Sequence, residues 1–287
     1  MTILNIKIIA LLLMVLSHIY DFFPESPIIF NMLGYISAPL FIFAFIEGIK
    51  HTKNKKSFFL RIYIFSIIMQ INSNLLAGYT GDINYNIVRT FVNIFILIYL
   101  LEKYNETNKV FNKGLLIYLS FQLIMFIFTY LLILNVDIQE STLYLIHTII
   151  PTAMNTEGGF YYLILGIIFY YFSENRKLLI ISYCTILPFV FLIFSTDLLY
   201  KILFRLSGIF DPAAMILKGL ITVFLNIDPF LNETGILEFP VWMFVFSLVF
   251  ILFYNGAKGY NNKAFKYFFY VFYPLHLWIL YLLSVNI

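Results

Sequence analysis

The stretch GLLIYLSFQLIMFIFTYLLILN, residues 114–135, contains no charged side chain and decides the fold class. A helix needs about 20 apolar residues to cross the ~30 Å hydrocarbon core of a bilayer, so this stretch is long enough to span. Because the bilayer core offers backbone groups no hydrogen-bond partner, a spanning segment must be a helix or belong to a closed barrel. A continuous apolar run lacks the alternation of a barrel strand, and it therefore predicts a transmembrane helix.

Apolar stretches of similar length cover most of the chain on both sides of this one. The sequence is 62% hydrophobic and 11% charged, with a mean hydropathy of +0.91, whereas a soluble domain carries about 25% charged residues. The sequence therefore predicts an all-α fold, a polytopic transmembrane helix bundle of about 9 to 11 helices that forms a single domain over residues 1–287. The predicted spans are residues 6–23, 28–49, 58–77, 87–102, 114–135, 142–172 (interrupted), 178–195, 238–255 and 266–285.

Residues 198–235 have a weaker apolar pattern, and we expect an interfacial or re-entrant helical segment there. Charged residues and two prolines interrupt the apolar background in this segment. They are Lys201, Arg205, Asp211, Pro212, Lys218 and Pro229.

Lysine and arginine concentrate in every second loop, and the positive-inside rule makes such loops cytoplasmic. The basic loops are residues 50–56, 103–113, 176–177 and 258–266. The intervening loops are acidic and should face outward; they hold Asp21, Glu25, Asp82, Asp137, Glu140, Asp197, Asp228, Glu233 and Glu238. This pattern predicts a cytoplasmic N-terminus, an outer C-terminus and an odd number of crossings, with residues 198–235 leaving and returning on the outer side.

The composition also indicates which partners are expected. The lipid bilayer is the expected environment, as a multi-pass protein of the cell (plasma) membrane, and a net charge of +3 gives no support for a nucleic-acid partner. The single cysteine, Cys184, lies in an apolar run, so neither a disulfide framework nor a cysteine-based metal site is expected within one chain. We expect no metal.

Two of the four histidines, His18 and His276, lie within predicted spans, roughly 15 to 20 Å along their helices from the cytoplasmic side. Ionisable groups in spans are costly and usually face the bundle interior, so each is a functional candidate. An imidazole can serve as general base or acid near neutral pH. A histidine that only hydrogen-bonds between helices is an equally good interpretation at this point.

A second candidate cluster follows the second span. Glu47 and His51 are four residues apart and so share a helical face, and Lys50, Lys53, Lys55, Lys56 and Arg61 come close after them. Such cations could hold the phosphates of an activated donor such as coenzyme A. For the lysines alone, contact with lipid headgroups is the favoured interpretation.

A third polar group lies in the third and fourth spans: Gln70, Asn72, Asn74, Arg89 and Asn93. These residues could line a polar cavity or hydrogen-bond between helices, and the sequence does not choose. In the sixth span, Glu157, Gly158 and Gly159 interrupt the helix just after His147, and such breaks occur at membrane depth only against protein or a cavity.

Motifs at both ends of the chain resemble those of TraX-type membrane proteins. The N-terminal ones are KIIALLLMVLSH at residues 7–18, APLFIFAFIEG at residues 38–48 with His51 and Thr52, and Arg61. The C-terminal ones are YNGAKG at residues 254–259 and FFYVFYPLH at residues 268–276.

The resemblance implies acetylation chemistry, because that family is associated with acetylation of the N-terminal amine of conjugative pilin. The family is also distantly similar to membrane acyltransferases that take acetyl groups from cytoplasmic acetyl-CoA. Two positions depart from its pattern: Ser17 stands where an Asp precedes the first-span histidine, and Gly34-Tyr35 where Gly-Arg is typical. Asp21, one turn after Ser17, is a candidate to orient His18 in place of that Asp.

Together these observations predict an acetyl-CoA-dependent membrane acyltransferase. His18 would act as general base on an acceptor amine or hydroxyl, and His276 would polarise or position the thioester. Glu47, His51, Lys53 and Arg61 would shape the coenzyme A entrance. The acceptor could be a pilin or peptide N-terminus, or a sugar or lipid of the cell envelope. The rival functions are a transporter and a scaffold for pilus or secretion assembly.

Overall fold

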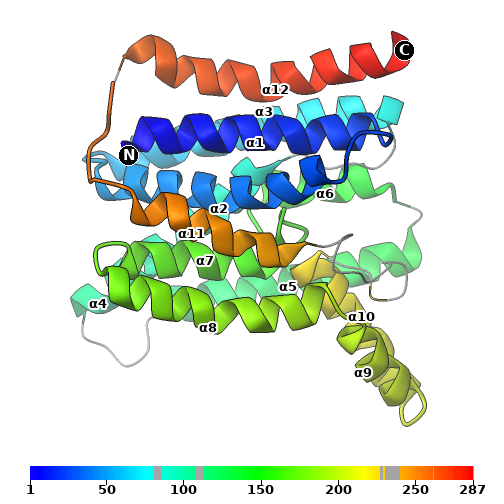
Figure 1. Cartoon of the computed structure of the whole chain (residues 1–287). Coiled ribbons are helices and arrows are strands. Elements are labelled where there is room, and N and C mark those ends of the chain that lie inside the picture. Colours follow the sequence, from blue (N-terminus) through cyan, green and yellow to red (C-terminus); the bar gives the residue numbers. More distant parts are fainter. Residues whose placement is uncertain are drawn as a thin grey trace. The chain divides into compact units, whose positions relative to one another are not determined.

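The computed structural model describes residues 1–80, 86–107, 113–136, 138–226, 229, 240–260 and 262–286. All regular structure in these residues is helical (Figure 1), which confirms the predicted all-α class. Among the described residues, six helices are long and apolar enough to cross a membrane: Ile3–Phe22, Ile29–Lys50, Lys55–Tyr79, Lys113–Ile133, Arg176–Phe194 and Tyr267–Asn286. Two shorter helical stretches, Gly159–Phe172 and Val241–Leu252, are equally apolar in character.

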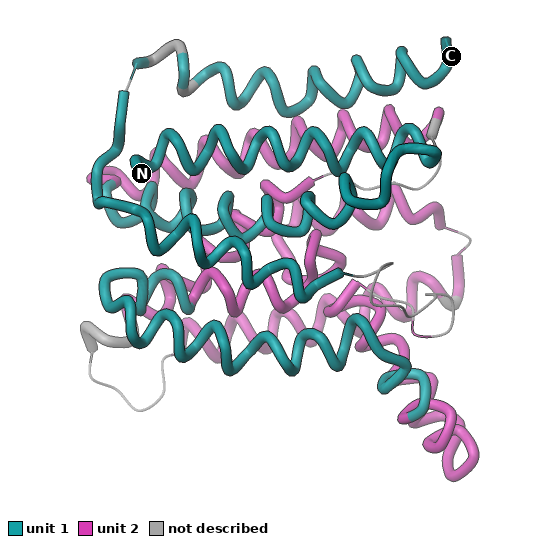
Figure 2. Tube along the Cα trace, viewed as in Figure 1, with its two compact units in different colours: residues 1–51, 168–201, 231–287 teal, residues 52–167, 202–230 magenta. Residues whose placement is uncertain are grey.

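The chain forms two compact units (Figure 2). Unit 1 comprises Met1–His51, Ile168–Lys201 and Leu231–Ile287, and unit 2 comprises Thr52–Ile167 and Ile202–Phe230. Unit 1 holds α1 (Ile3–Phe22), α2 (Ile29–Lys50), α8 (Arg176–Phe194), the 3-10 helix η1 (Val241–Met243), α11 (Phe244–Leu252) and α12 (Lys263–Asn286). Unit 2 holds α3 (Lys55–Thr80), α4 (Ile87–Thr107), α5 (Lys113–Asn135), α6 (Glu140–Ile149) and α10 (Asp211–Leu225), while α7 (Gly159–Phe172) and α9 (Leu198–Ser207) cross the boundary.

The helix ends follow local sequence signals. The Thr2 side chain accepts a hydrogen bond from the Asn5 backbone at the start of α1, and the Asn175 side chain caps α8 in the same way. Pro212 lies in the first turn of α10, where its missing N–H costs nothing, and Asn226 ends that helix in a left-handed conformation. The prolines inside α2, α8 and α12 are of the kind that membrane helices tolerate.

The predicted sixth span is broken as expected, because α6 ends at Ile149 and α7 begins at Gly159. The segment 198–235 is helical at α9 and α10, and its interfacial or re-entrant placement stays a prediction. Several acidic outer-loop residues lie outside the described residues: Asp82, Asp137, Asp228, Glu233 and Glu238. Residues 108–112 of the second basic loop, 103–113, are also outside them.

Two sets of contacts tie loop residues to helix ends in unit 1. The Met1 amino group donates to the Phe253 carbonyl at 2.6 Å, and the Ile3 N–H donates to the Ala257 carbonyl at 2.9 Å. At the end of α2, Lys50 Nζ donates to Ser173 Oγ at 2.7 Å. The cytoplasmic placement of the basic loops stays a prediction from the charge pattern.

Large apolar side chains remain exposed on the helices. In α5, for example, Ile117 is 67% exposed and Ile124 is 63% exposed. Water-soluble proteins rarely leave such continuous apolar faces uncovered, whereas a lipid bilayer covers them at no cost. The described residues therefore have the surface of a membrane protein.

Candidate functional site

The histidines of the first and last spans meet inside unit 1. His18 Nδ1 lies 2.7 Å from His276 Nε2, although 258 positions separate the two residues in the chain. Both side chains are buried, with 8% and 4% of their surface exposed. His18 belongs to the buried stripe of α1, which also contains Ile6, Ala10 and Met14 at intervals of one turn. The helical period therefore directs this imidazole toward the protein interior.

A backbone carbonyl sets the direction of the hydrogen bonds. His276 Nδ1 lies 3.0 Å from the Phe272 carbonyl oxygen, which can only accept, so Nδ1 must carry the proton. In a neutral His276, Nε2 is then the acceptor, and His18 must donate from Nδ1. The second nitrogen of a neutral His18, Nε2, consequently holds a lone pair and is the basic atom of the pair.

The rings of the two histidines meet edge to edge. Their centroids are 5.0 Å apart and their planes differ by 11°. The centroid separation exceeds the N···N distance by about two ring radii, as expected when the hydrogen bond lies in the plane of both rings. The Phe272 ring stacks on His276 at 5.2 Å, with the planes 6° apart, and this stacking fixes the imidazole orientation.

His18 lies nearer the end of α1 than its middle. At ~1.5 Å per residue it is roughly 22 Å from Ile3 but only roughly 6 Å from Phe22. His276 lies near the middle of α12, roughly 20 Å from Lys263 and roughly 15 Å from Asn286.

The two departures from the TraX pattern lie at a close contact between α1 and α2. A Cβ added to Gly34 would lie 2.3 Å from both Cβ and Oγ of Ser17, so these helices approach each other through small residues. Tyr35 packs its ring against Phe244, with centroids 5.7 Å apart. The orienting partner that the structure provides for His18 is His276, and a role for Asp21 stays a prediction.

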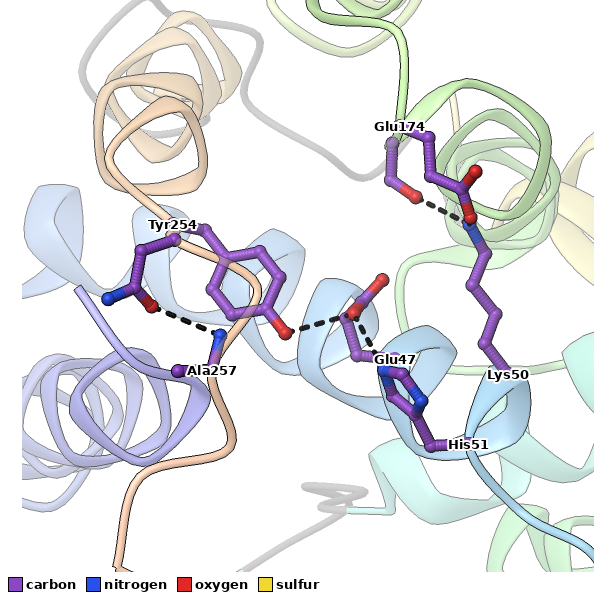
Figure 3. A network of polar contacts seen from close by, with 8 residues as sticks. Glu47, Lys50, His51, Glu174, Tyr254 and Ala257 are labelled. Atoms are coloured by element: carbon purple, nitrogen blue, oxygen red, sulfur yellow. Dashed lines mark hydrogen bonds and ion pairs between the residues drawn. The ribbon is translucent and has the colours of Figure 1, made fainter.

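A second polar network lies at the loop end of α2 (Figure 3). The carboxylate of the buried Glu47 accepts a hydrogen bond from the Tyr254 hydroxyl at 3.0 Å and lies 3.7 Å from His51 Nε2. Burial, reinforced by the Glu47 charge, raises the pKa of the Tyr254 hydroxyl to about 12. The sequence analysis gave Tyr254 no role, although this residue begins the YNGAKG motif.

Lys50 takes part in a neighbouring contact of the same network. Its ammonium donates to Ser173 and lies 3.3 Å from Glu174 Oε1, and it also lies 5.7 Å from the centre of the Tyr170 ring. These partners tie the end of α2 to the turn before α8 (Figure 3). Lys50 therefore has a structural role.

Lys53 and Arg61 belong to unit 2, so their place beside Glu47 and His51 stays a prediction. Arg61 is exposed; its Nε donates to the Ser57 carbonyl of its own helix, and its guanidinium lies 5.9 Å from the Phe58 ring. Lys53 is also exposed.

The polar residues of the third and fourth spans make interhelical hydrogen bonds in unit 2. Gln70 Oε1 accepts from Asn86 Nδ2 at 2.9 Å and from Thr148 Oγ1 at 3.2 Å. Asn74 Nδ2 donates to the Ser141 carbonyl at 2.9 Å. Gln70 and Asn74 therefore make the interhelical hydrogen bonds that one interpretation predicts, while a polar cavity stays a prediction.

The fold and site define a polytopic helical membrane protein with a buried pair of histidines. A sequence model of one family, described as TraX protein, matches residues 4–209, and the chain therefore belongs to the TraX family. Comparisons with curated proteins and with solved structures found no match. The matched residues include His18, Glu47 and His51, whereas His276 lies beyond them.

Proposed function

We propose that this protein is an acetyltransferase of the cell membrane that moves an acetyl group from acetyl-CoA to an amine. The observation that carries the proposal is the His18–His276 hydrogen bond, which leaves His18 Nε2 as a base of defined orientation. Membership of a family associated with pilin acetylation supports the same chemistry. The acceptor that this association favours is the N-terminal amine of a pilin or another peptide.

The proposed transfer is direct. A neutral acceptor amine gives its proton to His18 Nε2 as its nitrogen attacks the thioester carbonyl carbon. The carbon–sulfur bond then breaks, and the thiolate of coenzyme A leaves with the proton that the imidazolium returns. The products are the amide and free coenzyme A, with neither oxidation nor reduction.

His276 serves as a positioning residue in this mechanism. Both of its nitrogens are occupied, one by His18 and the other by the Phe272 carbonyl, so it has no free donor for the thioester oxygen. Its effect is to keep the proton on Nδ1 of His18 and to stabilise the imidazolium. Of the two roles predicted for His276, polarising or positioning, the proposal uses positioning, here of His18.

The distance between the two networks of unit 1 fits the donor. Gly34 packs beside Ser17, the neighbour of His18, and the stretch of α2 from Gly34 to Glu47 is roughly 20 Å long. The acetyl carbon and the diphosphate of acetyl-CoA are separated by about sixteen bonds, roughly 19 Å when extended. An extended donor could thus reach the histidines while its phosphates stay at the loop end.

Glu47 and the basic residues would have different roles toward that donor. A carboxylate repels phosphate, so Glu47 would instead accept hydrogen bonds from the amide or hydroxyl groups of the pantetheine arm. His51 would donate a hydrogen bond to the phosphates, and a contribution of Lys53 and Arg61 from unit 2 stays a prediction from the sequence. This division of roles rests on the proposed donor.

The test is acetyl transfer by the purified protein in detergent, followed as release of free thiol from acetyl-CoA and as acetylation of a peptide with a free N-terminus. His18→Asn keeps a donor near the position of Nδ1 and so preserves the bond to His276, but it lacks a base at Nε2. We expect transfer to fall about 10²- to 10⁴-fold, with the thermal midpoint little changed.

Tyr183→Phe is the matched control. Tyr183 is a buried side chain of the same unit whose hydroxyl contacts Ser247 at 2.7 Å. This variant loses a buried hydrogen bond without touching the histidines, and it should keep wild-type transfer. Full activity of His18→Asn would refute the proposal and would suit a scaffold. Amino sugars and aminated lipids in place of the peptide test the envelope acceptors.

A further inference from the structure

A buried arginine in unit 2 has an unusual set of partners. The Arg89 side chain is 1% exposed; its Nη1 donates to the Tyr144 carbonyl at 3.1 Å, and its guanidinium lies 5.3 Å from the Tyr144 ring centre. Within the described part of the chain, Nε and Nη2 of this arginine have no hydrogen-bond partner. A buried guanidinium with two unsatisfied N–H groups is costly, so a native protein normally compensates it.

The open atoms form one edge of the guanidinium. Nε and Nη2 are adjacent donors with parallel N–H bonds, which is the arrangement that binds the two oxygens of a carboxylate or phosphate. Nη1 and the face over Tyr144 are occupied by the contacts just described. The free edge therefore has the geometry of a bidentate oxyanion site.

Two further buried polar side chains, Gln122 and Thr152, belong to or contact the break between α6 and α7. Gln122 Oε1 accepts from the Ala153 N–H at 3.0 Å, which fixes the amide orientation and directs Nε2 away from that bond. Gln122 Nε2 and Thr152 Oγ1 are both buried and, among the residues described, have no hydrogen-bond partner.

Contacts of neighbouring residues connect Arg89 to the same break. Thr90, the next residue in α4, donates from Oγ1 to the Glu157 carbonyl at 2.9 Å. His147 is close enough to Arg89 to interact with it electrostatically, and its carbonyl accepts the Thr152 N–H at 3.3 Å. A helix break at membrane depth requires a protein or cavity environment. Contacts therefore link this break to the segments of Arg89, Gln122 and Thr152, whose open donors were described above.

We propose that Arg89, Gln122 and Thr152 form a binding site for one small oxyanion, a carboxylate or phosphate. Arg89 holds two oxygens through Nε and Nη2, while the Gln122 amide and the Thr152 hydroxyl donate to the ligand. Because all three side chains are buried within unit 2, the proposed ligand is a free ion and not a lipid headgroup. The site is independent of the acetyl-transfer proposal.

Glu157 determines the strength of this site. Its carboxylate interacts electrostatically with Arg89 and so competes with any bound anion for the same positive charge. Glu157→Gln removes that competition and should tighten anion binding about threefold. If Glu157 were instead the sole counter-ion of Arg89, this variant would lose stability and gain no response to anions.

The experiment is thermal unfolding of the full-length protein in detergent, in sodium phosphate or sodium acetate against sodium chloride at equal ionic strength. We expect a saturable rise of the unfolding midpoint for at least one of the two oxyanions. Arg89→Lys keeps the charge but loses the planar edge, and it should raise the half-saturating concentration at least tenfold.

Thr152→Val and Thr222→Val are a matched pair of control variants. Thr222 Oγ1 in α10 is also buried and without a hydrogen-bond partner in the described residues, but it is not part of the proposed site. Thr152→Val should raise the half-saturating concentration severalfold, and Thr222→Val should leave it unchanged. Equal effects of the two variants would overturn the proposal.

Two other results would also overturn it: a wild-type midpoint that is identical in phosphate, acetate and chloride, and an Arg89→Lys variant that responds like the wild type. Addition of phosphatidylglycerol to the micelles separates a lipid phosphate from a free ion. We expect no Arg89-dependent stabilisation from this lipid, and such a stabilisation would contradict the enclosed site.

Discussion

The two polar networks of unit 1 differ in whether their members carry charge. The His18–His276 pair joins two imidazoles and a backbone carbonyl, groups that can all be neutral. The loop end of α2 instead carries Glu47, Lys50 and His51, which form or can form ion pairs. Charge is expensive at membrane depth and cheap where helices end. The difference separates a network suited to proton transfer from one suited to binding a charged ligand.

Among the variants that test this difference between the two networks, the largest effect on activity is expected at His276. His276→Phe removes the acceptor for His18 Nδ1 and should lower kcat for acetyl transfer about 10²-fold, with KM little changed. His276→Gln keeps a polar group near the position of Nε2 and should retain activity within about tenfold of wild type. Equal losses in both variants would show that His276 does more than position His18.

The close contact between Gly34 and Ser17, the neighbour of His18, provides a second test of the histidine network. Gly34→Ala places a methyl group 2.3 Å from Ser17, so α1 and α2 must separate. We expect a loss of about 1–3 kcal/mol of stability, together with weaker transfer. Gly78→Ala is the control, because a Cβ at Gly78 meets nothing within 4 Å. A thermal midpoint for Gly34→Ala equal to that of Gly78→Ala would refute the contact.

Tyr254 reports on the charged network at the loop end. Its pKa is raised to about 12 by burial and by the Glu47 charge, so the protonated phenol is the form that the folded protein favours. Its stabilising contribution is therefore complete below pH ~10 and is lost as pH rises toward 12.

The measurement is a phenolate absorbance titration of wild type minus Tyr254→Phe. In a Glu47→Gln background the midpoint should move back toward 10, because the amide accepts a hydrogen bond without carrying charge. A midpoint that does not respond to Glu47→Gln would leave burial as the entire cause of the shift.

The smallest effect is expected at an ion pair outside both networks. Lys201 lies 2.8 Å from Asp197 and lowers the carboxyl pKa through a hydrogen bond, but the carboxyl is exposed. Asp197→Asn should leave the thermal midpoint unchanged at neutral pH, since solvent screens such pairs. Any contribution would be present above the ordinary carboxyl pKa of 3.8 and lost as pH falls below it. A clear drop at neutral pH would contradict this.

The helices were predictable because their cause is local. Each apolar stretch is long enough to span, so α1, α2, α5 and α8 lie within a few residues of the predicted bounds. The break between α6 and α7 was signalled by Glu157, Gly158 and Gly159, and both glycines adopt positive φ angles. His18, His276 and Glu47 were singled out because ionisable groups in spans are rare.

The partners of those residues could not be predicted. Nothing local indicates that Tyr254 reaches Glu47 across 207 positions, or that the backbone of Phe272 sets the tautomer of His276. The open edge of Arg89 was equally hidden, since the sequence shows an arginine but not which of its N–H groups are satisfied. Lys53 and Arg61 remain candidates on charge alone.

The sequence by itself determined that this chain is a helical membrane protein, roughly where its long helices lie, and which few polar residues are costly to place in a span. These properties depend on hydropathy and helical period, which are read along one segment at a time. Only the tertiary structure decided that the imidazoles of α1 and α12 share a hydrogen bond and that Arg89 is left with two open donors. Such facts depend on packing between distant segments, because a hydrogen bond forms only when donor and acceptor lie within about 3 Å of each other.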